Sequence, residues 1–63
     1  MSYLIVLYIL VNGVFIEAGI RAENGQDYDK YPTLAKCQAQ VKKDMAEHFA
    51  GKEAQMKLVC EKR

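Results

Sequence analysis

The sequence predicts a small α+β domain, in which a three-stranded antiparallel sheet of ββαβ topology carries one helix on one face. Three observations support this prediction: an Asn12-Gly13 dipeptide between two apolar runs, a helical pattern after Pro32, and an alternating segment near the C-terminus. With 63 residues, the chain is expected to form a single domain over residues 1–63. An apolar content of 51% and a charged content of 27% exclude a disordered tail or a low-complexity linker.

The first two strands are predicted to form a hairpin around the Asn-Gly dipeptide. Asn-Gly favours a two-residue type I′ turn when β-branched and aromatic residues flank it. Counting back from this turn places Ile5 opposite Ile20 and Leu4 opposite Arg21. Because side chains alternate along a strand, the Ile5 set forms an uncharged face, and the Leu4 set forms a mixed but largely apolar face.

A helix is predicted after the polar connection of residues 21–31, in which Asn24-Gly25 indicates a second turn. Thr33 is the expected N-cap, and Gly51 is the expected stop. Apolar side chains at steps of three and four form one stripe on this helix, composed of Leu34, Cys37, Val41, Met45 and His48 or Phe49.

The third strand is predicted after Lys52, where apolar and polar residues alternate. Met56, Leu58 and Cys60 share one face, and Val59 points to the other. The first strand is the most apolar and should lie in the centre. This gives the strand order 2-1-3, antiparallel throughout, with the helix on the uncharged face and a right-handed crossover.

The two cysteines are expected to be neighbours. A helix antiparallel to the third strand places Cys37, in its first turns, beside Cys60, near the end of that strand. A disulfide between them would close a loop of about 24 residues and contribute roughly 3 kcal/mol. The alternative is two reduced, buried thiols that pack as small apolar groups.

The cellular compartment stays open between two expectations. The apolar run of residues 3–16 spans about 21 Å as a helix, too short to cross a bilayer, and no basic residue precedes it. We therefore expect no membrane span and a cytoplasmic location in a bacterial host cell. An oxidised Cys37–Cys60 pair would instead indicate a periplasmic or secreted protein.

Catalysis, metal binding and nucleic-acid binding have little support in the sequence. His48 lies about 16 Å along the helix from Cys37, so the two cannot share a zinc ion. Ser2 is the only serine, and the glycines make no phosphate-binding pattern. Residues 32–63 carry seven basic and four acidic side chains, too dispersed for a nucleic-acid site. We expect no enzyme, no cofactor, no metal and no nucleic-acid partner.

One helix can cover only one face of the sheet, so the other face is expected to expose apolar side chains and to bind a partner. A second candidate is the acidic loop with its tyrosine, which would suit a basic partner. The predicted interaction residues are Leu4, Val6, Tyr8, Leu10, Phe15, Glu17 and Val59 on the sheet, and Asp27, Tyr28 and Asp29 in the loop.

The segments NGVFIEAG, YPTLAKCQAQ and KLVCEK resemble those of short bacterial and phage ββαβ proteins with a Tyr-Pro-Thr helix start and two cysteines. In size and style the chain is also similar to anti-CRISPR inhibitors of mobile elements, which block nuclease complexes by occupying a surface. The bare sheet face indicates a non-enzymatic protein-binding module, and the resemblance implies that its partner is a subunit of such a complex. The alternative is an exported, disulfide-stapled structural protein that forms a homodimer through its bare sheet face.

Overall fold

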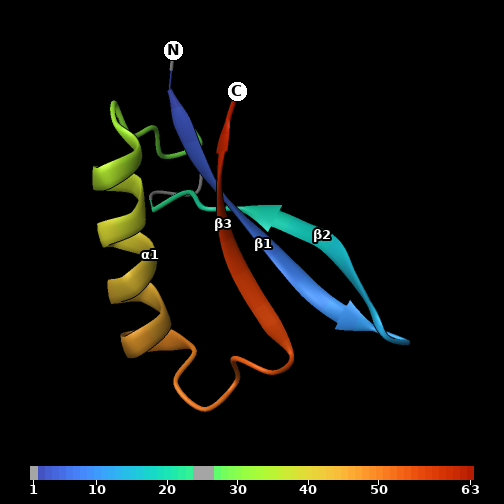
Figure 1. The fold of residues 1–63 in the computed structure, drawn as a ribbon. Coiled ribbons are helices and arrows are strands. Elements are labelled where there is room, and N and C mark those ends of the chain that lie inside the picture. The colour runs from blue at the N-terminus through green and yellow to red at the C-terminus, as the bar shows by residue number, and fades with distance from the viewer. Residues whose placement is uncertain (1, 24–26) are drawn as a thin grey trace.

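A computed structural model describes residues 2–23 and 27–63 of the chain. Its elements are β1 (Tyr3–Val11), β2 (Val14–Ile20), α1 (Leu34–His48) and β3 (Met56–Lys62). The three strands form one antiparallel sheet in the order β2-β1-β3, with the helix along one side (Figure 1). The predicted α+β fold and strand order are confirmed. The turn expected at Asn24-Gly25 lies outside the described residues.

The hairpin turn has the backbone that a type I′ turn requires. Asn12 has a φ of 51° and Gly13 a φ of 80°, both in the left-handed region. Val11 pairs with Val14 directly across the turn. The dipeptide therefore sets the hairpin register near the turn as predicted.

Further from the turn, a β-bulge shifts this register by one residue. Tyr8 pairs with Glu17, but the next residue of β1, Leu7, pairs with Gly19, so that Ala18 is the extra residue. A one-residue shift exchanges the two faces of a strand for every residue beyond it.

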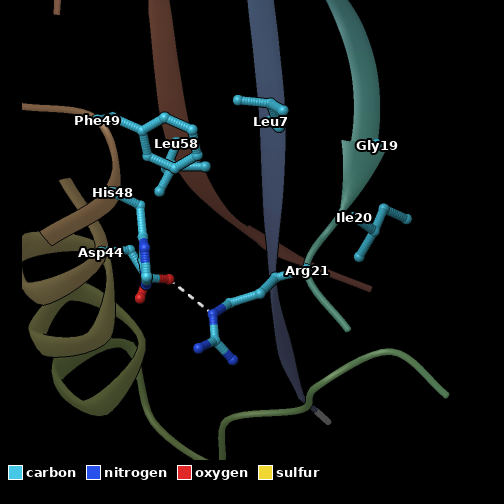
Figure 2. A pocket seen from close by; sticks show the side chains of 8 residues that line it. All are labelled: Leu7, Gly19, Ile20, Arg21, Asp44, His48, Phe49 and Leu58. Atoms are coloured by element: carbon cyan, nitrogen blue, oxygen red, sulfur yellow. Dashed lines mark hydrogen bonds and ion pairs between the residues drawn. The ribbon is translucent and has the colours of Figure 1, made fainter. Parts of the chain in front are cut away.

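The bulge overturns two predicted pairs. Ile20 lies opposite Val6 instead of Ile5. The amide of Arg21 donates to the carbonyl oxygen of Ile5 at 2.9 Å, so Arg21 does not lie opposite Leu4. As a result Arg21 points to the helix side of the sheet and Ile20 to the opposite side, as their side chains show in Figure 2.

Helix α1 begins where its cap predicts. The hydroxyl of Thr33 accepts a hydrogen bond from the amide of Lys36 at 3.2 Å. Beyond the last turn, Gly51 adopts a φ of 82°, which favours glycine. The stripe facing the sheet differs from the expected one, because Leu34 is exposed and Asp44 is buried.

The disulfide joins the helix to β3 at the centre of the small core. Cys37 and Cys60 are bonded with their Cα atoms 6.1 Å apart, which confirms the expected pairing. Cys60 lies opposite Ile5 on β1, so the helix covers the Ile5 face as predicted. Ile5, Val6 and Cys37 have no exposed surface.

The two ends of the described chain lie side by side. The amide of Arg63 donates to the carbonyl oxygen of Ser2 at 3.1 Å and continues the pairing of β1 with β3. Figure 1 shows both ends on one side of the molecule and the hairpin turn on the opposite side. The amides and carbonyls of Tyr3 and Tyr31 also pair at 2.9 Å, beyond the end of β2.

Candidate protein-interaction surface

The sheet face opposite the helix is only partly bare. Leu4 is 8% exposed and Val6 has no exposed surface, so the expectation that both are available to a partner is wrong. The hydroxyl of Tyr8 donates a hydrogen bond to the carboxylate of Glu61, which stands opposite Leu4. This bond directs the Tyr8 side chain along β1 toward Leu4, past Val6. The tyrosine thus covers part of the face to which it belongs.

Arg63 completes this cover. Its Nη2 donates to Oε1 of Glu61 at 2.8 Å and to Oε1 of Glu17 at 3.0 Å, so it joins β3 to β2 across the face. The hydrogen bond from Tyr8, followed by that from Arg63, lowers the pKa of Glu61 below its ordinary value. The same bond to Glu61 raises the pKa of the Tyr8 hydroxyl. We call Tyr8, Glu17, Glu61 and Arg63 the polar cover.

Beyond the polar cover, Leu10 and Phe15 remain exposed on this face. They are paired on β1 and β2. Nζ of Lys57 lies 4.4 Å from the centroid of the Phe15 ring and 5.6 Å from that of Tyr8, in cation–π geometry. Val59 is half-buried beside Val6. The apolar patch on this face is therefore smaller than predicted and lies near the hairpin turn.

The helix-side face of the same hairpin is exposed as well, which the sequence did not reveal. Four side chains expected beneath the helix are between 36% and 62% exposed. Strand β3 pairs with β1 only as far as Ile9, so β1 and β2 continue alone as a two-stranded ribbon. Such ribbons twist strongly, and Figure 1 shows the hairpin turning away from α1. These four residues are Ile9, Val11, Val14 and Ile16.

We call residues 9–16 the hairpin arm. Both of its faces are apolar, and it contains no charged residue. The length of β1, which exceeds that of β3 by two residues, is the feature that would have indicated the arm. The exposed apolar surface thus lies on a projecting element and not over the centre of the sheet.

The acidic loop is divided between structural and exposed groups. The carboxylate of Asp29 forms an ion pair with Arg21 and accepts a hydrogen bond from the amide of Glu23 at 3.1 Å. Tyr28 and Asp27 are exposed. Of the three predicted loop residues, Asp27 and Tyr28 present their side chains to solvent, whereas Asp29 holds the loop to the end of β2.

A polar cluster fastens this loop to the helix. Nε of Arg21 donates to Oδ2 of Asp44 at 2.6 Å (Figure 2). Nη1 of Arg21 lies 3.2 Å from the hydroxyl oxygen of Tyr31. Gln40 donates to the other oxygen of Asp44 at 2.8 Å. Burial raises the pKa of the Tyr31 hydroxyl, although the neighbouring Arg21 opposes this effect. Every bond of the cluster is internal, which indicates a structural role.

A pocket of about 260 Å³ opens between the end of α1 and the sheet. Leu7, Leu58 and Phe49 give it apolar walls, and the Arg21–Asp44 pair closes one end (Figure 2). The pocket lies where the helix and the hairpin arm begin to diverge. Its size suits a single apolar side chain or ring, and the Arg21 and Asp44 side chains that line it are already paired with each other.

The described part of the chain shows no grouping of three or more His, Cys, Asp or Glu side chains suited to hold a metal ion. Among the residues that the structure describes, α1 is too short and too polar to cross a membrane. No protein-family model, curated protein or solved structure matches the chain significantly.

Proposed function

We propose that this chain is a non-enzymatic protein-binding module that acts by covering part of a partner's surface. The hairpin arm is the observation that supports this function. It projects from the domain with six large apolar side chains that are all at least 36% exposed. Exposed apolar patches on small soluble proteins mark interaction sites, since their burial against a partner removes apolar surface from water.

The surroundings of the arm suit a protein interface. Phe15 provides an aromatic anchor, and Lys57 against its ring adds a charge at the border of the apolar patch. Interfaces commonly combine an apolar, aromatic centre with a polar rim. Asp27 and Tyr28 offer a second, acidic contact. A basic patch beside an apolar groove is therefore the partner surface that we expect.

Two charge-introducing variants on the arm test this function. Phe15→Asp places a charge on the face of the polar cover, and Val14→Asp places one on the helix-side face. The matched control is Ala39→Asp on the exposed surface of the helix. Circular dichroism first establishes that all three variants fold. In pull-downs from cells of the source organism, a partner retained by wild type and Ala39→Asp but lost with an arm variant supports the proposal.

The comparison also shows which face binds. Loss with Phe15→Asp alone assigns binding to the Leu10 face, and loss with Val14→Asp alone assigns it to the opposite face. Equal recovery of the partner with wild type and both arm variants contradicts the proposal.

For the partner, we propose a subunit of a bacterial nuclease complex, on the basis of the similarity in size and style to anti-CRISPR inhibitors. Plasmid interference provides a direct test. In bacteria with an active CRISPR nuclease, the wild-type chain should raise the transformation efficiency of a targeted plasmid, and the arm variant that loses binding should not. An unchanged efficiency across a panel of such systems contradicts this choice of partner.

A second candidate function is an exported structural protein, and the Cys37–Cys60 disulfide favours it. Disulfides persist in oxidising compartments and are rare in the cytosol. Alkylation of free thiols in intact cells distinguishes the two compartments. If neither cysteine is alkylated because the pair is oxidised, export is supported. If both thiols are alkylated, the protein is cytoplasmic.

A further inference from the structure

We propose that the outer edge of β2 pairs with the same edge of a second copy about a two-fold axis, so that two sheets join into one of six strands. This inference does not rest on the partner proposed above, because the backbone groups at the outer edge of β2 carry the pairing. It depends on which backbone groups point outward, on the one symmetric register they allow, and on a charge match across that register.

The outward groups follow from the pairing of β1. The amide of Leu10 donates to the carbonyl oxygen of Gln55 at 2.8 Å, so Leu10 directs its backbone groups toward the β3 side. Backbone groups alternate in direction along an antiparallel strand. Phe15 lies opposite Leu10, and Glu17 lies opposite Tyr8. Tyr8 is two residues from Leu10, so it also directs its backbone groups toward β3 and not toward β2. Phe15 and Glu17 therefore direct their N–H and C=O groups away from the sheet.

Before the bulge at Ala18, the outer edge of β2 has little protection against pairing. Edge strands are usually protected by lysines, prolines or inward-pointing charges. Strand β2 contains none of these, and its one charged residue, Glu17, is held by Arg63 on the face. The other edge strand, β3, carries Lys57 and Lys62. Of the two edges, that of β2 is the one suited to accept another strand.

One symmetric register satisfies the outward groups. Centring the two-fold axis at Ile16 places Phe15 opposite Glu17 of the second copy, and each pair exchanges two hydrogen bonds, about four in total. Centring it at Glu17 would oppose two like charges. Centring it at Phe15 would oppose Glu17 to Gly13, which already belongs to the turn. The Ile16 register also brings two exposed isoleucine side chains into contact.

This register brings opposite charges together. Phe15 and Glu17 of the second copy share the face on which Lys57 lies against the Phe15 ring. Arg63 holds one oxygen of Glu17, Oε1, at 3.0 Å. When the two edges pair, we expect the other oxygen of Glu17 to approach Lys57 of the second copy, and the two-fold axis would form this ion pair twice. A second copy of the chain is thus a fitting occupant of the edge.

The expected dimer is weak. The bulge at Ala18 interrupts the regular edge immediately after Glu17, so the paired segment is short. Small interfaces of this kind are typical of transient association. The mass of the purified chain should rise with concentration from 7.2 kDa toward twice that value in sedimentation equilibrium. A mass that stays at 7.2 kDa up to millimolar concentration overturns the proposal.

Charge reversal tests the register. Glu17→Lys and Lys57→Glu should each weaken the dimer about tenfold, because each places two like charges together. The double variant should restore the dissociation constant toward that of wild type. The proposed register is overturned if either single variant dimerises as tightly as wild type. It is also overturned if the double variant dimerises no more tightly than the single variants. Circular dichroism confirms that each variant is folded.

Backbone methylation tests the edge without changing a side chain. A synthetic chain with an N-methyl group at Phe15 loses one outward donor in each copy and should remain monomeric. The control is N-methyl-Leu58, because Leu58 lies opposite Leu7 and directs its amide to the outer edge of β3. Dimerisation of the control but not of N-methyl-Phe15 supports pairing through β2. A dimer that persists with N-methyl-Phe15, or is lost in a folded control, overturns it.

Discussion

Arg21 donates a hydrogen bond of 2.6 Å from Nε to Oδ2 of Asp44, and this pair fastens the end of β2 to the helix. Asp44 is 4% exposed and also accepts a hydrogen bond from Gln40. The bulge at Ala18 makes the pair possible, because it turns Arg21 to the helix side. A buried carboxylate needs such partners, since an unpaired buried charge is costly.

Replacing Asp44 with Asn should lower the free energy of unfolding by about 2 kcal/mol. The side chain keeps its size, but the Arg21 guanidinium loses a charged partner under the helix. Urea unfolding measures the change. Arg63→Ala is the matched control, because it removes ion pairs whose partners are more exposed, and it should lower the free energy of unfolding much less than Asp44→Asn. Equal losses for the two variants would contradict the structural role of Asp44.

Removing the disulfide should cost about 3 kcal/mol, because the Cys37–Cys60 bond restricts the unfolded chain. The double variant Cys37→Ala, Cys60→Ala tests this without a reductant. In a domain of this size, such a loss lowers the Tm by roughly 12 to 24 °C. Thermal unfolding followed by circular dichroism measures it. A Tm within a few degrees of wild type would show that packing alone maintains the fold.

Acid should weaken the polar cover at Glu61. Its pKa is lowered in the folded state, so its contribution to stability is present above its ordinary value near 4.5 and is lost as the pH falls through the lower folded pKa. Between about pH 5 and pH 2, the Tm of wild type should therefore fall more steeply than that of Glu61→Gln. Parallel Tm profiles for the two proteins would contradict this assignment.

Base should weaken the same cover at Tyr8. The pKa of its hydroxyl is raised above 10.0, so the hydrogen bond to Glu61 contributes below that value and is lost as the pH rises through the raised pKa. Tyr8→Phe should abolish this part of the alkaline loss of Tm. The absorbance change of tyrosinate formation, compared between wild type and Tyr8→Phe, measures the titration of Tyr8 directly. A Tyr8 pKa at or below 10 would contradict the hydrogen bond.

Adding a methyl group to a glycine should destabilise the domain at Gly13 in the hairpin turn but not at Gly19 in β2. Gly13 has a φ of 80°, so Gly13→Ala should cost about 1 to 2 kcal/mol even though an added Cβ meets no neighbour. Gly19→Ala is the control, because an added Cβ there also meets no atom and no left-handed backbone is involved. It should change the unfolding midpoint little. A larger loss for Gly19→Ala than for Gly13→Ala would contradict this account of the turn.

Local signals explain why the elements could be predicted. The turn preference of Asn12-Gly13 and the cap at Thr33 act over a few residues and are readable in the sequence. The pairing of Cys37 with Cys60 followed from the strand order, since the start of the helix must meet the end of β3. These predictions needed no knowledge of side-chain packing.

The bulge and the polar cover could not be predicted in the same way. The sequence at the end of β2 allows either Ile20 or Arg21 to face the helix. In the structure Arg21 faces it and forms a hydrogen bond with Asp44, which lies 23 residues further along the chain. Similarly, Tyr8 and Glu61 meet only because their side chains extend along the sheet and not straight out of it. The alternation of side chains along a strand predicts on which face a residue lies, but not which other side chains extend over that face. The burial of Leu4 and Val6 therefore could not be predicted.

The contact between Ser2 and Arg63 has a practical consequence. A label or tether attached at Ser2 or Arg63 begins on the side of the molecule away from the arm (Figure 1). Immobilising the chain by one end therefore leaves the projecting ribbon accessible in solution. Fluorophores at both ends would start close together and separate on unfolding, so energy transfer between them would report the folded state.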